Sequence, residues 1–217
     1  AWRGRTDDEI RDNRVALLRN GQWRAPQPLG AEGWKIAGCP VNGPSISALG
    51  NNVVASWFTA EGDRPRVRAA FSDDGGVTFG KPIDIDDLAP LGRVGLTWRD
   101  SQSAVVSWLS APGVEQKKSA LNIKVIYTDG RIEATRQLAE VSSGRDTGVP
   151  QMVFTADGLL LAWTNPAPQY GITTKIMRHA DLKLAAQTVS KDKRQQKLAV
   201  LDNKFLINAA ICTSNHE

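Results

Sequence analysis

Five arginines stand in segments rich in glycine, proline and polar residues, and arginine is the side chain best suited to hold an anion. A planar guanidinium binds a carboxylate through two parallel hydrogen bonds, so arginines that converge would form an anion-binding site. Two aspartates directly follow two of these arginines and are the acidic candidates for proton transfer. The set comprises Arg5, Arg11, Arg64, Arg93 and Arg145, with Asp12 and Asp146.

Each of the two aspartates also has a structural interpretation, which we favour. A carboxylate next to an arginine can pair with that arginine or accept backbone N–H groups in its own loop. Asp146 directly precedes a predicted inner strand, whereas Asp12 lies in the N-terminal loop. Whether either one performs chemistry depends on the elements that position it.

Those elements follow a repeat that is marked by tryptophan. Trp2, Trp57, Trp108 and Trp163 are separated by 55, 51 and 55 residues. Before each of the last three, a polar turn leads into a short apolar run that ends at the tryptophan, and a second hairpin follows. Four antiparallel strands in about 50 residues are typical of the blades of a β-propeller.

Helical alternatives are disfavoured because 19 glycines and 11 prolines interrupt the chain and no long helical periodicity survives. Residues 7–18 are the most helix-like stretch, and we expect a loop followed by a strand there. The sequence thus predicts an all-β fold, a propeller of four-stranded antiparallel blades.

The tip of one hairpin, residues 72–79, carries the pattern S-x-D-x-G-x-T-F on Ser72, Asp74, Gly76, Thr78 and Phe79. We expect Asp74 to accept backbone N–H groups inside the turn and Phe79 to point into an apolar layer. The pattern resembles the Asp box of the sialidase-like (BNR repeat) β-propellers. In that family the box lies away from the active site, which implies a structural role for these five residues.

The repeat predicts one propeller domain over residues 1–217, or a fragment of one with about four blades. It divides into half a blade at 1–40, blades at about 41–86, 92–139 and 147–190, and half a blade at 197–211. The alternative is a closed four-bladed ring in which the C-terminal strands pair with the N-terminal ones. Because the family that it resembles is usually six-bladed, we favour the fragment.

In a propeller, the loops between the second and third strands share a face with the loops between blades, and the five arginines fall on that face. The loop at 33–44 stands out there because it combines Trp34, Lys35, Cys39 and Asn42 with glycines and prolines. Its G-C-P-x-x-G-P segment resembles one in a bacterial exo-sialidase-like subgroup. Trp34 and Cys39 could fill a seam between blades, which we favour; alternatively Trp34, Lys35 or Asn42 contacts a ligand.

The resemblance to sialidases implies three arginines on a sugar carboxylate, a tyrosine nucleophile with a glutamate, and an aspartate as acid/base. The chain departs from that pattern. Tyr127 leads into a hairpin tip on the opposite face, and Tyr170 lies in a loop between the second and third strands. The chain also lacks the F-R-I-P segment that carries the first arginine of the family.

Composition excludes several classes of partner. The net charge of +4 is spread along the chain, and the densest basic stretch, 191–197, has no aromatic residue, so we predict no nucleic-acid partner. Cys39, Cys212, His179 and His216 lack the spacing of a zinc site, and we predict no metal or cofactor. A disulfide between the cysteines stays open.

No run of residues reaches the roughly 18 apolar positions of a membrane span. The chain carries no signal peptide, although one could precede the sequence, and we expect an extracytoplasmic location. We favour a propeller that binds a carbohydrate or another small anionic ligand on its loop face. The alternatives are an exo-sialidase-type glycoside hydrolase completed by further blades, and a scaffold in an extracytoplasmic complex.

Overall fold

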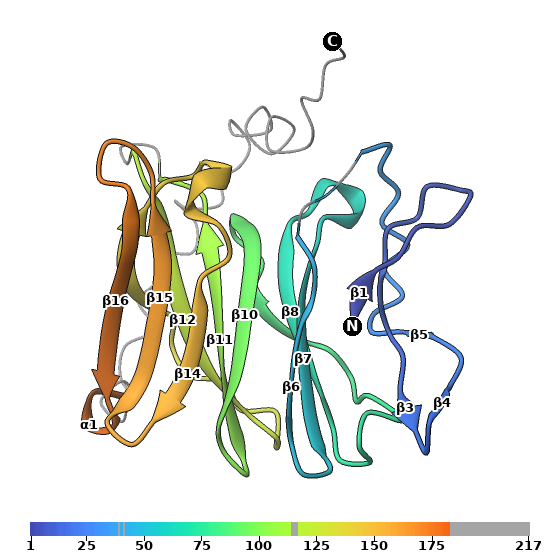
Figure 1. Cartoon of the computed structure of the whole chain (residues 1–217). Helices are drawn as coiled ribbons and strands as arrows, with labels where there is room; N and C mark the ends of the chain where they lie inside the picture. Colours follow the sequence, from blue (N-terminus) through green and yellow to red (C-terminus); the bar gives the residue numbers. More distant parts are fainter. Residues whose placement is uncertain (39, 41, 114–116, 183–217) are drawn as a thin grey trace.

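The computed structural model of the protein describes residues 1–38, 40, 42–113 and 117–182, and strands dominate it (Figure 1). The strands form antiparallel sheets that follow one another along the chain and stand side by side. The prediction of an all-β fold built from antiparallel blades is thus confirmed. Outside the described residues lie Cys39, Cys212 and His216, the basic stretch 191–197, the end of the predicted blade at 147–190 and the predicted half blade at 197–211.

Two sheets have four strands each, and in both the spatial order of the strands is their order in the sequence. The first contains β6 (Ser45–Leu49), β7 (Asn52–Thr59), β8 (Arg66–Ser72) and β9 (Ile83–Asp86). The second contains β10 (Pro90–Asp100), β11 (Ser103–Ser110), β12 (Ser119–Tyr127) and β13 (Arg136–Val141). Trp57 lies on the second strand of the first of these sheets and Trp108 on the second strand of the other.

Smaller sheets flank these two. On one side stand β14 (Gln151–Thr155), β15 (Gly158–Asn165) and β16 (Gly171–Arg178), followed by the short helix α1 (His179–Leu182), which the sequence analysis did not expect. On the other stand β1 (Trp2–Arg3), β2 (Asn13–Val15) and β5 (Gln27–Pro28), with a hairpin of β3 (Leu18–Arg19) and β4 (Gln22–Trp23). Residues 7–18 form a loop followed by strand structure, as expected.

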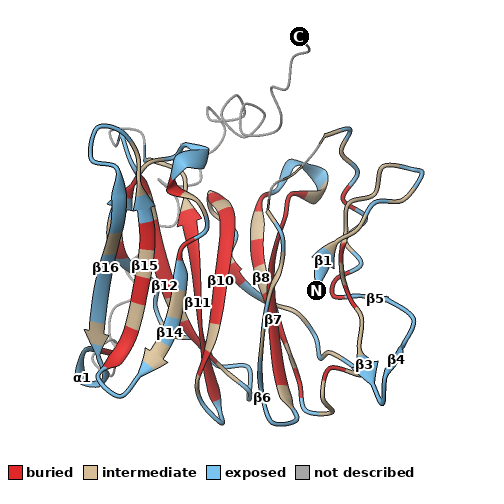
Figure 2. Ribbon diagram, in the orientation of Figure 1, coloured by how far each residue is buried: buried red, intermediate tan, exposed pale blue. Residues whose placement is uncertain are grey.

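The core lies between neighbouring sheets, where the buried residues concentrate (Figure 2). Successive side chains of a strand point to opposite faces, so the second strands of the two four-stranded sheets pack on both neighbouring sheets. On β7, Val54 and Phe58 pack against the next sheet through Leu96, while Trp57 packs against the preceding sheet through Leu29. The interfaces between sheets, which we call seams, therefore supply most of the apolar burial.

The repeated tryptophans occupy the same place in their sheets. Trp57 and Trp108 are fully buried and Trp163 is 8% exposed, each on the second strand and each facing the preceding sheet. The Nε1 groups of Trp57 and Trp108 donate to carboxylates of Glu32 and Asp86, at 2.8 and 2.6 Å. Their common surroundings support the assignment of the loops to one face.

Two lysines repeat in the same way across the seams. Lys124 on β12 donates to the backbone carbonyl of Ile85, and Lys175 on β16 donates to that of Leu138 at 2.7 Å. Ile85 and Leu138 are buried residues of the last strand of the preceding sheet. Each lysine thus joins the third strand of its own sheet to the sheet before it.

In the described part of the chain, no helix is long and apolar enough to span a membrane.

Candidate functional site

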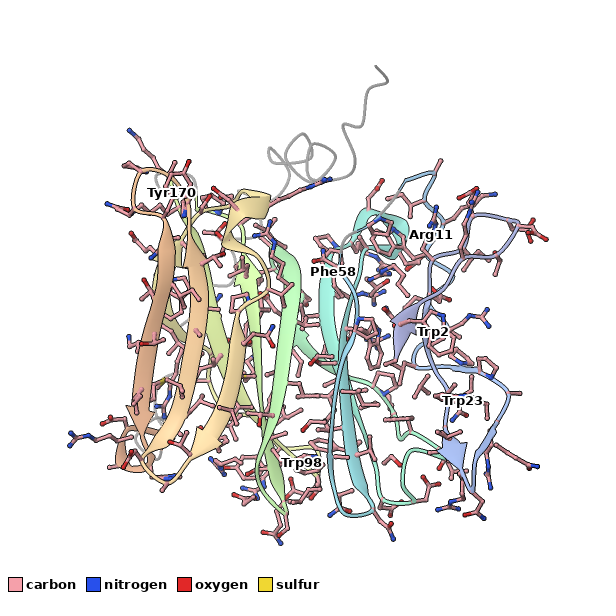
Figure 3. The ribbon with its side chains drawn as sticks, viewed as in Figure 1. Trp2, Arg11, Trp23, Phe58, Trp98 and Tyr170 are labelled. Atoms are coloured by element: carbon pink, nitrogen blue, oxygen red, sulfur yellow. The ribbon has the colours of Figure 1, made fainter. Side chains whose placement is uncertain are left out.

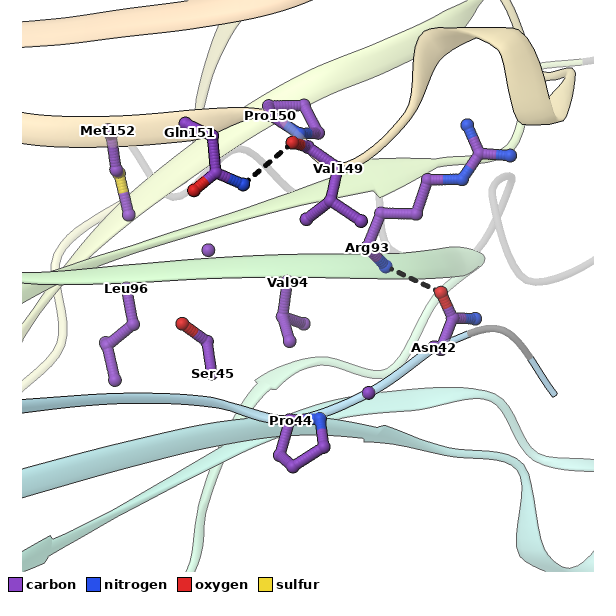
Figure 4. Close-up of a pocket in the computed structure, with 12 residues that line it drawn as sticks. Asn42, Pro44, Ser45, Arg93, Val94, Leu96, Val149, Pro150, Gln151 and Met152 are labelled. Carbon is purple, nitrogen blue, oxygen red and sulfur yellow. Dashed lines mark hydrogen bonds between the residues drawn. The ribbon is translucent and has the colours of Figure 1, made fainter. Parts of the chain in front are cut away.

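A pocket of about 240 Å³ opens where the first strands of three successive sheets meet. The central strand β10 contacts both β6 and β14, which stand on either side of it. The lining comprises Asn42, Gly43, Pro44, Ser45, Arg93, Val94, Gly95, Leu96, Val149, Pro150, Gln151 and Met152 (Figure 4). Asn42 and Arg93, two of the predicted ligand-binding residues, are therefore brought together here.

The start of β10 is irregular at this point. Arg93 has a φ of 54°, which is uncommon for a residue with a side chain, and it follows Gly92 with a φ of 83°. The register of β10 against β11 shifts on both sides of Gly92. Such bulges redirect side chains and gather at functional sites, so this irregularity marks the pocket as a place to look for function.

The side chain of Asn42 holds this irregular backbone. Its Oδ1 accepts the N–H of Arg93 at 2.9 Å, and its Nδ2 donates to the carbonyl of Leu91 at 2.9 Å. A Cβ on Gly92 would lie 2.7 Å from Asn42, so only glycine fits there without movement. Asn42 thus pairs with β10 much as a neighbouring strand would.

Arg93 lines one end of the pocket, where Figure 4 shows its backbone N–H bonded to the Asn42 side chain and its own side chain extending away from Asn42. The residue is only 9% exposed, and burial lowers the pKa of its guanidinium, while the charge of Asp146 acts in the opposite direction. Nη2 donates to the carbonyl of Ser143 at 3.3 Å, whereas Nη1 is buried and has no hydrogen-bond partner in the structure. A buried cationic donor without an acceptor is uncommon in folded proteins and singles out Arg93 among the lining residues.

The rest of the lining combines a few polar groups with an apolar wall. Ser45 offers a hydroxyl, and Gln151 offers an amide whose Nε2 donates to the carbonyl of Val149 at 3.0 Å. Val94, Leu96 and Met152 supply apolar surface. None of the twelve described residues that line the pocket is acidic, a histidine or a tyrosine, so the lining supports binding better than proton transfer.

The other predicted arginines do not line this pocket. Arg5 and Arg11 both pair with Glu9, and Arg64 pairs with Glu61 at 3.5 Å. Arg145 is exposed in the short 3-10 helix η2 (Arg145–Thr147). The described residues therefore give one guanidinium at the pocket, not a cluster of three.

The two candidate aspartates accept hydrogen bonds from loop residues. Asp12 accepts the backbone N–H groups of Gly33 and Trp34, at 2.9 and 3.0 Å, and so fixes the loop that follows the N-terminal sheet. Asp146 accepts the Ser142 hydroxyl at 3.0 Å and the N–H of Thr147 at 3.1 Å. Both carboxylates accept backbone N–H groups, as the sequence analysis favoured, but those that Asp12 accepts lie 21 and 22 residues further along the chain.

Trp34 is buried against Phe58, edge to face, with ring centroids 5.7 Å apart. Lys35 is exposed and forms an isolated β-bridge with Ile10. Neither residue lines the pocket. Of the three residues of this loop that were predicted to contact a ligand, only Asn42 lines the pocket.

The sequence analysis missed Arg3, which organises the loops beside the pocket (the region near Arg11 and Phe58 in Figure 3). Its guanidinium lies over the ring of Trp34 and donates to three backbone carbonyls, those of Arg11, Asn42 and Phe58, at 2.7–2.8 Å. Burial lowers the pKa of Arg3 to about 10, so the cation persists at neutral pH. Nothing in the sequence separates Arg3 from the other loop arginines.

Sequence reasoning also missed Ser45 and Gln151, because both begin strands instead of lying in loops. The sequence nevertheless marks both positions. Each stands at the start of the first strand of a blade, next to a proline, Pro44 and Pro150, where the chain enters from the loop face.

The Asp box lies at the far end of its sheet, between β8 and β9. Asp74 accepts the Thr78 hydroxyl at 2.6 Å, the backbone N–H groups of Val77 and Thr78 at 2.9 Å, and the Ser72 hydroxyl at 2.8 Å. These hydrogen bonds lower the pKa of Asp74, and the bond from the Thr78 hydroxyl has the largest effect. Gly76 has a φ of 84° and donates its N–H to the Ser72 hydroxyl, while Phe79 packs on the cluster around Trp57.

Comparison with known proteins identifies no family for this chain. No family model matches the chain, and no curated protein matches it. Among solved structures, one described as a thermostable family-43 glycoside hydrolase is similar, with 11% identity and a TM-score of 0.45. The match covers 76% of this chain and 61% of that one, so the chain spans less than two thirds of that structure's length.

Proposed function

We propose that this chain is a sialidase-like propeller, or part of one, that binds a carbohydrate or another small anionic ligand in the Arg93 pocket. The observation that carries this proposal is the guanidinium of Arg93. It is buried, it sits on an irregular backbone, and its Nη1 has no hydrogen-bond partner. Because Nη1 is enclosed by protein atoms, a ligand carboxylate or phosphate would supply the missing acceptor once the Arg93 side chain turned toward the pocket.

The remaining lining suits a small polar ligand with one apolar side. The hydroxyl of Ser45 and the amide of Gln151 can exchange hydrogen bonds with sugar hydroxyls, and Leu96 and Met152 can pack against an apolar group. One guanidinium matches one negative charge. We therefore expect acidic monosaccharides to bind more tightly than neutral ones.

The hydrolase alternative needs catalytic groups close to the ligand. These are usually a general acid together with a general base or a nucleophile. The described lining residues offer none of these, so binding is favoured for the chain as it stands. Residues from further blades would have to complete a catalytic set. The extracytoplasmic location and the scaffold alternative remain predictions from the sequence.

The test compares binding of N-acetylneuraminate, glucuronate and glucose to the whole chain by calorimetry, in the wild type and in Arg93→Gln. Loss of a charged hydrogen bond costs about 1.5–3 kcal/mol, so the affinity for the acidic sugars should fall roughly 10- to 150-fold. The control is Arg64→Gln, an exposed arginine of the same face that pairs only with Glu61 among the described ion pairs.

Equal loss of affinity in both variants would contradict the assignment of the site to Arg93, as would acidic and neutral sugars binding alike to the wild type. Circular dichroism of each variant checks that the sheets persist. A fluorogenic sialoside offered to the same samples tests the hydrolase alternative, because turnover would show that a catalytic set is present.

A further inference from the structure

One face of the last sheet lacks the cover that the equivalent faces of the two preceding sheets have. On β15, Leu160, Ala162 and Thr164 point away from Trp163 and so away from the preceding sheet. The register pairs them with Ile176, Thr174 and Ile172 on β16. We call this set of six residues the outer face.

The tryptophan repeat identifies the same positions in the other blades. In the second blade they are Val105, Ser107 and Leu109 on β11, paired with Val125, Ile123 and Leu121 on β12, and all six are 0–3% exposed. In the first blade they are Val54, Ser56 and Phe58 on β7, paired with Phe71, Ala69 and Val67 on β8. Five of those six are at most 5% exposed, and Phe71 packs on the same cluster.

On the outer face, in contrast, Ile172 is 72% exposed and Ile176 is 53% exposed. Val153, which pairs with Leu160 from β14, is 52% exposed. Figure 2 shows β16 as pale blue along most of its length, where the strands of the inner sheets are red. Four of the six positions that form a seam in both preceding blades are thus apolar here, namely Leu160, Ala162, Ile172 and Ile176, and the described residues do not cover this face.

The preceding seam shows what such a cover contains. Five alternate apolar residues on the first two strands of the last sheet pack on the face of β11 and β12: Met152, Phe154, Leu159, Leu161 and Trp163. A polar turn around Asp157 separates the two strands. The cover of a seam is therefore a strand pair with apolar residues at every second position.

Residues 198–209 align with residues 152–163 without a gap. At the five covering positions the segment has Leu198, Val200, Phe205, Ile207 and Ala209, and its turn falls on Asp202 and Asn203. All five are apolar, as in the seam before. The 14 residues from 183 to 196 can span roughly 46 Å when extended, enough to pass along the sheet and return to the loop face.

We propose that residues 197–211 of this same chain form a strand pair that packs on the outer face, with Phe205 and Ile207 against Ile172 and Ile176. The segment lies outside the described residues, so the proposal rests on the exposed face, its repeat equivalents and the spacing in the sequence. It is independent of the proposed ligand site.

Photo-crosslinking tests it directly on the whole chain. The photoreactive residue p-benzoylphenylalanine replaces Ile176, and mass spectrometry locates the products in a mixture of isotopically light and heavy protein. We expect crosslinks from position 176 to residues 197–211 of the same polypeptide. Crosslinks to a second copy, to another part of the chain, or to nothing would overturn the proposal.

The matched control places the same photoreactive residue at Lys175, which is adjacent on β16 but faces the preceding sheet, where its Nζ reaches the carbonyl of Leu138. Products from position 175 should therefore map near residue 138.

A second measurement keeps the proposal testable if the large photoreactive residue disturbs folding. Ile207→Lys should raise hydrogen exchange of the β16 amides roughly tenfold, because it removes the cover, while Leu206→Lys, on the opposite side of the same strand, should leave it near the wild-type rate. Equal effects of the two substitutions would refute the alternating contact that the proposal requires.

Discussion

The indole of Trp108 on β11 donates a 2.6 Å hydrogen bond to the carboxylate of Asp86, the last residue of β9 in the preceding sheet. Trp57 and Glu32 repeat the relationship one seam earlier, at 2.8 Å. The repeated tryptophan thus does two things, since its ring fills the seam and its N–H satisfies a carboxylate of the preceding sheet (Asp86) or of the loop that follows that sheet (Glu32).

This pair predicts the effect of removing the indole N–H. Trp108→Phe should lower the free energy of unfolding by about 1–3 kcal/mol, because the ring shrinks and Asp86 loses a donor in a partly buried seam. Urea denaturation measures it. Trp23→Phe is the control and should change stability by less than about 0.5 kcal/mol, because Trp23 is 70% exposed. Equal losses would show that the seam contact contributes nothing of its own.

The Asp box predicts a dependence of stability on pH. The pKa of Asp74 is lowered in the folded state, so its contribution is fully present above the ordinary carboxyl pKa and is lost as pH falls through the folded value. Asp74→Ala should therefore lower the melting temperature at pH 7 and flatten its fall below about pH 4.

Asp73→Ala provides the comparison for that experiment, because Asp73 is an exposed neighbour in the same turn. It should leave both the melting temperature at pH 7 and the shape of the acid profile close to those of the wild type. If the acid profile of Asp74→Ala kept the slope of the wild type, the hydrogen bonds of the turn would not be its source.

The bulge at the pocket predicts that Gly92→Ala will disturb both stability and ligand binding. The new Cβ would lie 2.7 Å from the Asn42 side chain and would also force a φ of 83° on alanine. We expect a loss of more than about 1 kcal/mol, with weaker binding because Arg93 moves. Thermal denaturation and calorimetry measure the two effects.

Gly130→Ala separates the two causes, since Gly130 has a φ of 88° but open space where a Cβ would stand. It should lower the free energy of unfolding only by the cost of placing alanine at a positive φ, and it should leave ligand binding unchanged. A loss of binding in Gly130→Ala as large as that in Gly92→Ala would argue against a local role for the contact between Gly92 and Asn42.

Much of the architecture was predictable because the interactions that define it join residues that are close in the sequence. The hairpins form between neighbouring segments, and their polar turns and apolar runs recur with Trp57, Trp108 and Trp163. The contacts of Asp74 all fall within residues 72–78, so the pattern of residue types alone specifies them.

The site was decided only by the tertiary structure. Five loop arginines look alike in the sequence, yet Arg93 alone lines the pocket, because Asn42, 51 residues away, holds its backbone and Ser143, 50 residues away, accepts from its guanidinium. The type of each residue determined which turns and strands could form. Burial, and with it the Nη1 atom of Arg93 that has no acceptor, depends on how sheets distant in sequence pack together.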